Sequence, residues 1–347
     1  MIAEIRLQQY RSYLDQNFKF SPGVNIIVGS NASGKTNLLE AVMVACQGSS
    51  FRASDNELIM HSKHWARIDA QSSSGPRSVK LKNSPNPSKA FEINNKPYKQ
   101  LSLINQLPVV LFEPNHLLML SGSPELRRNY LDGILELTKP GYKKAKRDYL
   151  KTLRQRNALL KSGRTNLNEL FPWNIRLSHL GGDIAASRHE LVLTLNKGIN
   201  SAYRALSNSK DKIALNYKST VELDSYESLL LKKLDADYEL DVLRGFTAHG
   251  PHREDLEILI NKKLPSMVAS RGEARTITIA LKTLEHNIIK HSTGKTPIIL
   301  LDDVFSELDD ARSMQLTELM NNNQTIITAA NLSSRYFKTN QTNQIRV

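Results

Sequence analysis

The chain has 347 residues, 40% of them hydrophobic, and a formal net charge of +13. Its mean hydropathy is −0.40, and no apolar run approaches the roughly 18 residues of a transmembrane helix. The only cysteine, Cys46, excludes an intramolecular disulfide, and MIAEIRLQQYRSYL at the N-terminus has no signal-peptide core, so we expect a cytoplasmic protein without a membrane span. The excess of positive charge favours a polyanionic partner, either a nucleic acid or an acidic membrane surface.

The first third of the sequence predicts mainly strands. Residues 1–28 alternate between apolar and polar side chains, and Ser21-Pro22-Gly23 forms a turn before the apolar run Val24–Val28. The polar stretch 71–99 contains many glycines, prolines and asparagines, which predicts short strands joined by turns. The compact run Leu107–Phe112 predicts a buried strand.

A Walker A pattern lies between the run Val24–Val28 and a predicted helix over Asn37–Val44. Its glycines let backbone N–H groups turn toward phosphate, and the helix N-terminus adds a positive field. Lys35 then reaches the β- and γ-phosphates, and the Thr36 hydroxyl ligates Mg²⁺. The alternative is a glycine-containing turn that binds nothing. The candidate ATP-binding residues are Gly29, Ser30, Asn31, Ala32, Ser33, Gly34, Lys35 and Thr36.

From about Pro124 to Asp241 the sequence is leucine-rich, charged and helical in period, with few strand signals. Over residues 142–160, apolar side chains fall on one side of a predicted helix and basic side chains on the other, with Lys146 and Arg156 adding charge nearby. This basic side is either a solvated face or a surface that follows the phosphates of DNA. The candidate DNA-binding residues are Lys143, Lys144, Arg147, Lys151 and Arg154.

Strand–turn–helix alternation returns after about Phe246. His249 and His252 are separated by Gly250-Pro251, which predicts a turn with hydrogen-bonded histidines in preference to a metal site.

The run Ile298–Asp303 predicts a buried strand that ends in two carboxylates, a Walker B pattern. Asp302 is the candidate Mg²⁺ ligand beside Thr36. Asp303, with Lys35, is the candidate catalytic residue, placed to orient or deprotonate the attacking water.

Ser270 and Glu273 have the spacing of a capping box at the start of another predicted helix. The alternative is an anion site made by Ser270, Gly272 and the positive helix end. This segment stands where ABC-type ATPases carry their signature motif, and Ser306–Asp309 stands at the position of their D-loop.

Walker A and Walker B lie near opposite ends of the chain, with the helical block between them. We therefore expect an α/β fold, an ABC-type P-loop ATPase domain with added β-strands and an inserted α-helical lobe. The expected division is 1–121 and 245–347 for the ATPase lobe and 122–244 for the helical lobe.

Five segments, in the expected order, resemble the RecF family of ATPases, which is related to SMC proteins. The resemblance extends over essentially the whole chain, and the second and third segments are closer to family-specific than Walker A is. The segments are Gly23–Glu40, Leu120–Asp132, Gly250–Leu256, Ser270–Lys282 and Leu300–Asp309.

The resemblance implies a weak, DNA-stimulated ATPase that acts as a switch in DNA recombination, repair, replication and the SOS response. It implies that ATP with Mg²⁺ closes a head-to-tail homodimer on double-stranded DNA and single/double-strand junctions near gaps, together with RecR and RecO. It implies that Ser270, Arg271, Gly272 and Glu273 contact the partner subunit's ATP and that Asp309 contributes to the dimer.

The sequence departs from relatives at two of these positions. Arg271 and Glu273 stand where many relatives have glycine or glutamine-type residues. Glu273 repels a γ-phosphate unless its side chain turns back into the capping box.

Three other classes of protein fit the sequence less well. An SMC-like structural ATPase needs coiled-coil arms of hundreds of residues, and sustained heptads are missing. The ATPase subunit of a transporter needs a glutamate after Asp302 and a switch histidine. A binding module with a degenerate nucleotide site conflicts with the intact Lys35, Thr36, Asp302 and Asp303.

Overall fold

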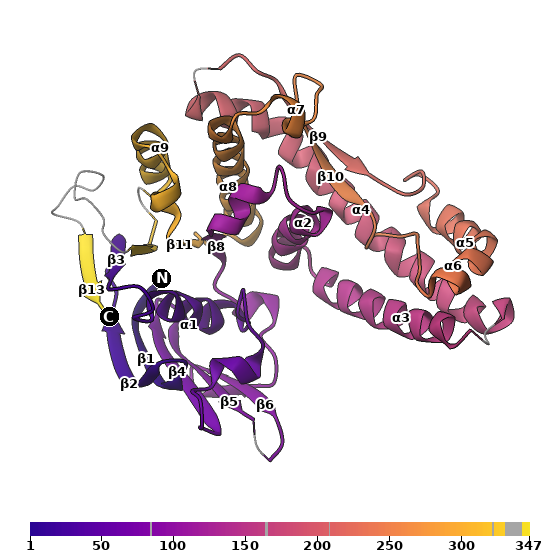
Figure 1. Ribbon diagram of the computed structural model, residues 1–347. Coiled ribbons are helices and arrows are strands. Elements are labelled where there is room, and N and C mark those ends of the chain that lie inside the picture. The colour runs from indigo at the N-terminus through magenta and orange to yellow at the C-terminus, as the bar shows by residue number, and fades with distance from the viewer. Residues whose placement is uncertain (84, 164–165, 208, 321–322, 330–341) are drawn as a thin grey trace. The chain divides into compact units, whose positions relative to one another are not determined.

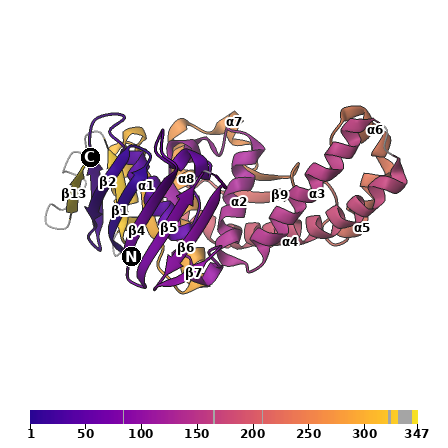
Figure 2. The ribbon, with the colours of Figure 1, turned by 90° about the horizontal axis from the view of Figure 1, so that it is seen from below.

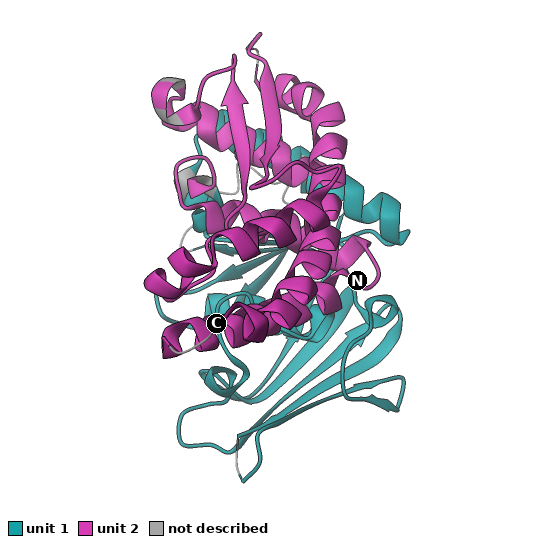
Figure 3. Cartoon of the chain, turned by 90° about the vertical axis from the view of Figure 1, so that its right-hand side faces the viewer, with its two compact units in different colours: residues 1–117, 285–347 teal, residues 118–284 magenta. Residues whose placement is uncertain are grey.

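The computed structural model describes residues 1–83, 85–163, 166–207, 209–320, 323–329 and 342–347. The chain divides into two compact units (Figures 1 and 3). Unit 1 comprises Met1–Leu117 and Glu285–Val347, and unit 2 comprises Leu118–Leu284. Among the described residues, no helix is long and apolar enough to cross a membrane.

Unit 1 contains most of the strands. Its elements are β1 (Ile2–Tyr10), β2 (Tyr13–Lys19), β3 (Val24–Val28), α1 (Lys35–Gln47), η1 (Asp55–Leu58), β4 (Trp65–Ser72), β5 (Gly75–Lys82), β6 (Ser88–Ile93), β7 (Lys96–Tyr98), η2 (Leu103–Asn105), β8 (Val109–Phe112), η3 (Pro114–Leu118, which ends one residue past the unit boundary), β11 (Ile298–Asp302), η4 (Val304–Glu307), α9 (Asp310–Met320), β12 (Thr325–Ala329) and β13 (Thr342–Arg346).

Two sheets enclose α1. The antiparallel sheet has the strand order β2-β1-β4-β5-β6-β7, and the parallel sheet has the order β13-β3-β12-β11-β8. Helix α1 contacts strands of both sheets, and its apolar side chains share one buried cluster with theirs. In Figure 1, α1 lies between the sheets, and Figure 2 shows the antiparallel strands in front of it. The helix that follows the Walker A loop is therefore part of the core.

Sequence pattern explains which faces are buried. In β1, Ile5 and Leu7 are buried while Arg6 is exposed, because alternate side chains of a strand point to opposite faces. In β11, all of Ile298–Leu301 is buried, as expected for a parallel strand that is covered on both faces.

Unit 2 is mainly helical. Its elements are α2 (Pro124–Thr138), α3 (Tyr142–Ser162), α4 (Leu167–Leu206), β9 (Ile213–Lys218), α5 (Tyr226–Ala236), α6 (Tyr238–Arg244), β10 (Asp255–Ile260), α7 (Pro265–Val268) and the first part of α8 (Arg271–Thr293), which continues into unit 1.

Buried ion pairs hold the helices of unit 2 together. Arg156 of α3 is fully buried and donates to Asp241 of α6 at 2.7 Å. Arg188 of α4 donates to Asp132 of α2 at 2.8 Å, and this guanidinium holds the pKa of the largely buried Asp132 below its usual range although burial opposes the shift. Such pairs require both partners, since a lone buried charge is strongly destabilising.

The expected α/β fold is confirmed, whereas the boundary of the helical lobe differs from the expected 122–244. Unit 2 runs from Leu118 to Leu284 because β9 lies within the helical block and pairs antiparallel with β10, which ties residues 255–260 to this unit. The described helices α3 and α4 have 21 and 40 residues, far short of long coiled-coil arms.

Candidate functional site

The loop between β3 and α1 has a backbone suited to an anion. Gly34 and Ala32 have φ values of +108° and +66°, the left-handed region that turns N–H groups inward. A Cβ on Gly29 would lie 2.4 Å from Ser33 Oγ, so a side chain does not fit there. Among the described residues, no side chain caps the N-terminus of α1 at Lys35, and its first turn has no acidic residue. The N–H groups at this helix end remain available to phosphate.

Lys35 is held over this loop. Its Nζ donates to the carbonyl oxygens of Gly29 at 2.9 Å and Ser30 at 2.8 Å. The ammonium group therefore lies against the backbone of the Walker A loop.

Walker A and Walker B meet through one hydrogen bond. Thr36 Oγ1 donates to Asp302 Oδ1 at 2.9 Å, across 266 residues of sequence. Thr328 Oγ1 donates to the same oxygen at 2.7 Å, because β11 and β12 are parallel and pair Asp302 with Thr328. Thr328 was missed by the sequence analysis, although its place at the end of an adjacent strand is a signal that could have identified it.

Thr36 and Asp302 fit a magnesium ion. They offer a hydroxyl and a carboxylate oxygen, and Mg²⁺ prefers a few such oxygens together with phosphate and water. The described residues contain no cluster of three or more histidine, cysteine or acidic side chains that forms a complete protein cage. This arrangement suits an ion that arrives with a nucleotide.

The backbone of Asp303 is fixed on both sides. Its N–H donates to Thr328 Oγ1 at 3.0 Å, and its carbonyl accepts from Ser306 Oγ at 2.7 Å. Its φ of +50° lies in the left-handed region, which aspartate adopts more readily than most residues with a side chain. Asp303 therefore begins its loop in a defined conformation directly after Asp302.

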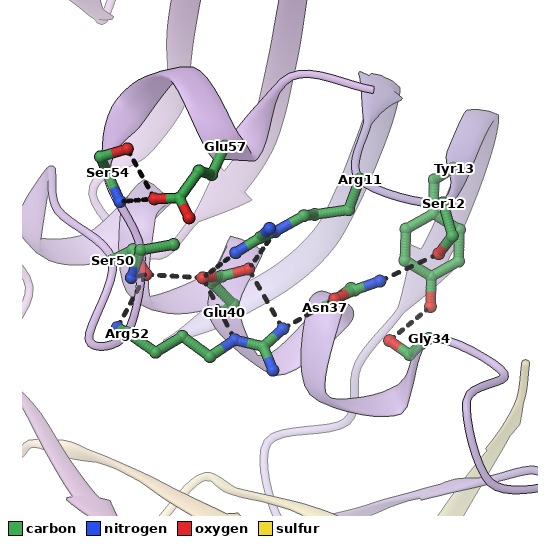
Figure 4. Close-up of polar contacts among 11 residues, drawn as sticks. Arg11, Ser12, Tyr13, Gly34, Asn37, Glu40, Ser50, Arg52, Ser54 and Glu57 are labelled. Atoms are coloured by element: carbon green, nitrogen blue, oxygen red, sulfur yellow. Dashed lines mark hydrogen bonds and ion pairs between the residues drawn. The ribbon is translucent and has the colours of Figure 1, made fainter. Parts of the chain in front are cut away.

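Glu40, on the second turn of α1, is the centre of a buried charge cluster (Figure 4). Its carboxylate is fully buried and accepts from Arg11 at 2.9 and 3.1 Å, from Ser50 at 2.6 Å and from Arg52 at 3.3 Å. Burial alone raises the pKa of Glu40, but hydrogen bonds from Arg11, Ser50 and Arg52 outweigh it and hold the pKa below its usual range. The cluster joins α1 to the β1–β2 turn and to the chain after α1.

The β1–β2 turn lies against the phosphate loop and the start of α1. Tyr13 Oη donates to the Gly34 carbonyl at 3.0 Å, and Ser12 Oγ accepts from Asn37 Nδ2 at 3.0 Å. A pocket of about 570 Å³ opens beside these residues. It is lined by Arg11, Ser12, Asn37, Asn56, Glu57, Ile59, Met60, His61, Ser62, Lys63 and Asn83. The sequence gives no sign of this turn's role, which depends on tertiary contacts.

The signature-like segment lies in unit 2 and forms the expected capping box. Ser270 N–H donates to Glu273 Oε2 at 2.7 Å, and Glu273 N–H donates to Ser270 Oγ at 3.2 Å. Helix α8 begins at Arg271, so Arg271 and Gly272 occupy its first turn. Glu273 thus turns back onto Ser270, which is the condition under which its charge does not face an incoming phosphate.

Asp309 caps helix α9. Its Oδ1 accepts from the N–H of Arg312 at 2.9 Å, and its Oδ2 forms an ion pair with the Arg312 side chain. Because the Asp309 side chain is half-exposed, the residue remains accessible at the surface of unit 1.

The basic side of α3 is exposed as the periodicity predicts. Lys143, Lys144, Arg147, Lys151 and Arg154 are all exposed, whereas Tyr142, Tyr149, Leu153 and Leu160 are buried.

Two other cations of this helix, Lys146 and Arg156, were expected to add charge near its basic side, and that expectation is wrong. Arg156 is fully buried beside Asp241, and Lys146 pairs with Asp132 and Glu136 at 3.0 and 2.9 Å. Neither belongs to the exposed basic face.

Two of the segments that resemble RecF, those containing Arg127 and His252, make contacts within unit 2. Arg127 pairs with Asp255 at 2.7 Å. His252 Nδ1 lies 2.7 Å from Tyr149 Oη and its Nε2 lies 3.0 Å from the Thr247 carbonyl, so the predicted turn with hydrogen-bonded histidines is confirmed. Burial lowers the pKa of His252 to about 4, which keeps the ring neutral near pH 7.

Comparison with known proteins identifies the family. The model of the RecF/RecN/SMC N-terminal domain matches residues 1–345. The chain is 35% identical over 328 residues to the DNA replication and repair protein RecF of Bacillus cytotoxicus, covering 91% of this chain and 87% of that protein. It is 34% identical over 340 residues to RecF of Acetivibrio thermocellus, covering 94% and 92% of the two chains.

Solved structures agree in fold. One described as the recombination mediator protein RecF-ATPrS in the RecFOR pathway has a TM-score of 0.86 at 29% identity and covers 96% of this chain and 93% of its own. An Smc head bound to a domain of ScpA has a TM-score of 0.53 at 15% identity, covers 95% and 89% of the two chains, and shares the fold alone. The chain therefore belongs to the RecF/RecN/SMC N-terminal domain family and, within it, to the RecF proteins.

Proposed function

We propose that this chain is an ATP-dependent DNA-binding protein of recombinational repair and replication-fork maintenance. In this proposal ATP closes a head-to-tail homodimer on double-stranded DNA or on a single/double-strand junction, and slow hydrolysis releases it. The hydrogen bond between Thr36 and Asp302 carries the proposal, because it joins a Walker A loop and a Walker B strand in one unit. The similar structures named RecF-ATP and RecF-ATPrS support ATP as the nucleotide.

The phosphate loop binds the triphosphate. The uncapped N–H groups of α1 and the Lys35 ammonium meet the phosphates, and Thr36 and Asp302 hold Mg²⁺. When bound, Mg²⁺ neutralises charge that develops on the β- and γ-phosphates. Asp303 orients the attacking water and accepts its proton. Its carboxylate is one methylene shorter than the glutamate of transporter-type ATPases, which favours a slow switch over a fast motor.

The second half of the ATP site comes from another copy of the chain. Ser270, Arg271 and Gly272 at the start of α8 contact the partner's ATP, while Glu273 stays in the capping box. Asp309 contributes to the dimer contact. A nucleotide held between two subunits stabilises their association because it binds the dimer more tightly than the monomer.

The net charge of +13 favours a polyanionic partner, and the relatives named DNA replication and repair protein support DNA as that polyanion. The exposed basic side of α3 follows the DNA backbone without reading bases. RecR and RecO are the proposed partners, since one similar structure is placed in the RecFOR pathway. A cytoplasmic location, expected from the sequence, belongs to the same proposal.

ATP turnover tests the switch. We expect turnover below about 1 s⁻¹, the low end of ordinary enzyme rates, that rises when duplex DNA is added. Turnover is measured as phosphate release with and without DNA, and Lys35→Ala, which removes the ammonium held over the phosphate loop, should reduce it to background. Faster turnover that ignores DNA contradicts the proposed switch.

The basic side of α3 is tested by the triple substitution Lys143→Ala, Arg147→Ala and Lys151→Ala. Each lost phosphate contact means that about one counterion fewer is released on binding. The slope of log affinity for duplex DNA against log salt should therefore flatten by about 0.9 for each lost contact, for up to three contacts. Fluorescence anisotropy at several salt concentrations measures the slope. The matched control is Lys19→Ala, Lys96→Ala and Lys99→Ala, three exposed lysines outside α3. An unchanged slope in the α3 variant contradicts the assignment.

A further inference from the structure

The antiparallel sheet of unit 1 carries a tryptophan on its open face. Trp65 begins β4, and its side chain is 39% exposed. Strand alternation places Ala66, Ile68 and Ala70 in the core, so Trp65 lies on the opposite face together with Arg67. Figure 2 shows this sheet with its strands in front of α1. An aromatic ring on a solvated strand face is available for contact with a planar ligand.

Three cations lie near Trp65 in the register of the sheet. In the register of β4 and β5, Trp65 pairs with Lys82, and Arg67 pairs with Lys80. Leu81 is buried between the two lysines, so both lysines share the open face with Trp65. Directly opposite residues in a sheet have Cβ atoms about 5 Å apart. We call these four residues, Trp65, Arg67, Lys80 and Lys82, the Trp65 corner.

Two of the three cations of the Trp65 corner have an acidic partner. Arg67 pairs with Asp69 at 2.8 Å and Lys80 pairs with Glu92 at 3.0 Å. Both pairs are partly exposed and therefore weak, so a phosphate can compete with the carboxylate. Lys82 has no ion pair among the described residues. Residues 59–99 contain eight lysines and arginines but only two acidic residues, so the corner lies in a basic part of the chain.

The backbone next to the corner is held by hydrogen bonds. Asn83 N–H donates to the His64 carbonyl at 3.1 Å, and Asn83 Nδ2 donates to the Lys63 carbonyl at 3.3 Å. These bonds fix the segment before Trp65 against the end of β5. A backbone that is already ordered loses little conformational entropy when a ligand binds beside it.

An exposed aromatic ring among cations on a flat strand face suits single-stranded nucleic acid. Bases of a single strand can stack on the ring while their phosphates meet neighbouring lysines. In a duplex the base faces are already stacked on one another, so the ring gains no such contact there.

We propose that the Trp65 corner binds single-stranded DNA, with one base stacked on Trp65 and adjacent phosphates held by Lys80, Lys82 and Arg67. This inference rests on the proposed function only in taking DNA as the polymer. In this proposal, unit 1 binds the single-stranded arm of a gap or junction. The residues that bind it belong neither to the phosphate loop nor to α3.

Intrinsic fluorescence tests the proposal directly, because the chain has two tryptophans. In Trp173→Phe, Trp65 is the remaining tryptophan, and titration with oligothymidylate should quench its emission. In the otherwise unchanged chain, Trp65→Ala should weaken binding of oligothymidylate by about 5- to 150-fold, the range for loss of one stacked base. Trp65→Phe should retain most of the affinity, and Lys82→Ala should lower the salt slope by about 0.7.

Two results overturn the proposal. One is unchanged Trp65 emission together with wild-type affinity of Trp65→Ala for oligothymidylate. The other is a loss of affinity in Trp65→Ala that is equal for single-stranded and duplex DNA. The titrations are made without ATP, so failure of ATP-driven dimerisation overturns the proposed function and leaves this result standing.

Discussion

Replacing Glu40 with alanine should lower the free energy of unfolding by about 3–5 kcal/mol, the usual loss when one partner of a buried ion pair is removed. The carboxylate is fully buried and binds Arg11, whose side chain is only 22% exposed. The variant leaves that guanidinium without its acceptor and also removes the acceptor of Ser50 Oγ. Arg52 is 37% exposed and regains water more easily, so it contributes less to the loss. Urea denaturation measures the effect.

Two controls separate the buried cluster from a general effect of losing a carboxylate. Glu40→Gln keeps the shape and one acceptor oxygen, so its loss should be smaller than that of Glu40→Ala. Glu92→Ala removes an exposed partner of Lys80 and should change the unfolding free energy by at most about 0.5 kcal/mol. Equal losses for Glu40→Ala and Glu92→Ala contradict the account of the cluster.

Replacing Asp303 with asparagine should lower ATP turnover by about 10²- to 10⁴-fold, the usual contribution of a general base. The substitution preserves the size of the side chain, and the backbone contacts with Thr328 and Ser306 do not depend on the carboxylate. ATP binding and the ATP-bound dimer should therefore persist. Single-turnover phosphate release measures the chemical step.

Asp302→Asn is the matched control one residue earlier. It weakens the acceptor of Thr36 and Thr328 and removes the charge that holds Mg²⁺, so it should impair Mg²⁺-dependent ATP binding. If Asp303→Asn loses ATP binding as Asp302→Asn does, its role is in the site's architecture and the assignment as a base is wrong.

Local pattern predicts much of the fold. Alternation identifies β1, and apolar runs identify β8 and β11, because burial on one or both faces leaves a direct mark on sequence. The charged and apolar sides of α3 follow from helical period in the same way. Arg156 was misjudged because its charge suggests solvent, while its partner Asp241 is far along the chain.

Long-range pairing explains what the sequence did not reveal. The six residues of β9 stand between helices, and their role becomes clear only from pairing with β10. Likewise, the sequence shows Glu40 only as one polar residue of a helix, because its partners Arg11 and Arg52 come from separate segments of the chain. Motif spacing located Thr36 and Asp302, but Thr328 and the Arg11–Tyr13 turn depend on strand order.

Light scattering with and without ATP tests the central claim, that ATP closes two copies of this chain. For wild type, we predict that Mg²⁺ and ATP raise the mass from that of one 39.1-kDa chain to that of two, and that duplex DNA joins the dimer. Lys35→Ala, which lacks the ammonium held over Gly29 and Ser30, should keep the mass of one chain under the same conditions. A wild-type mass that does not change with ATP, or a Lys35→Ala variant that still dimerises with ATP, contradicts the account.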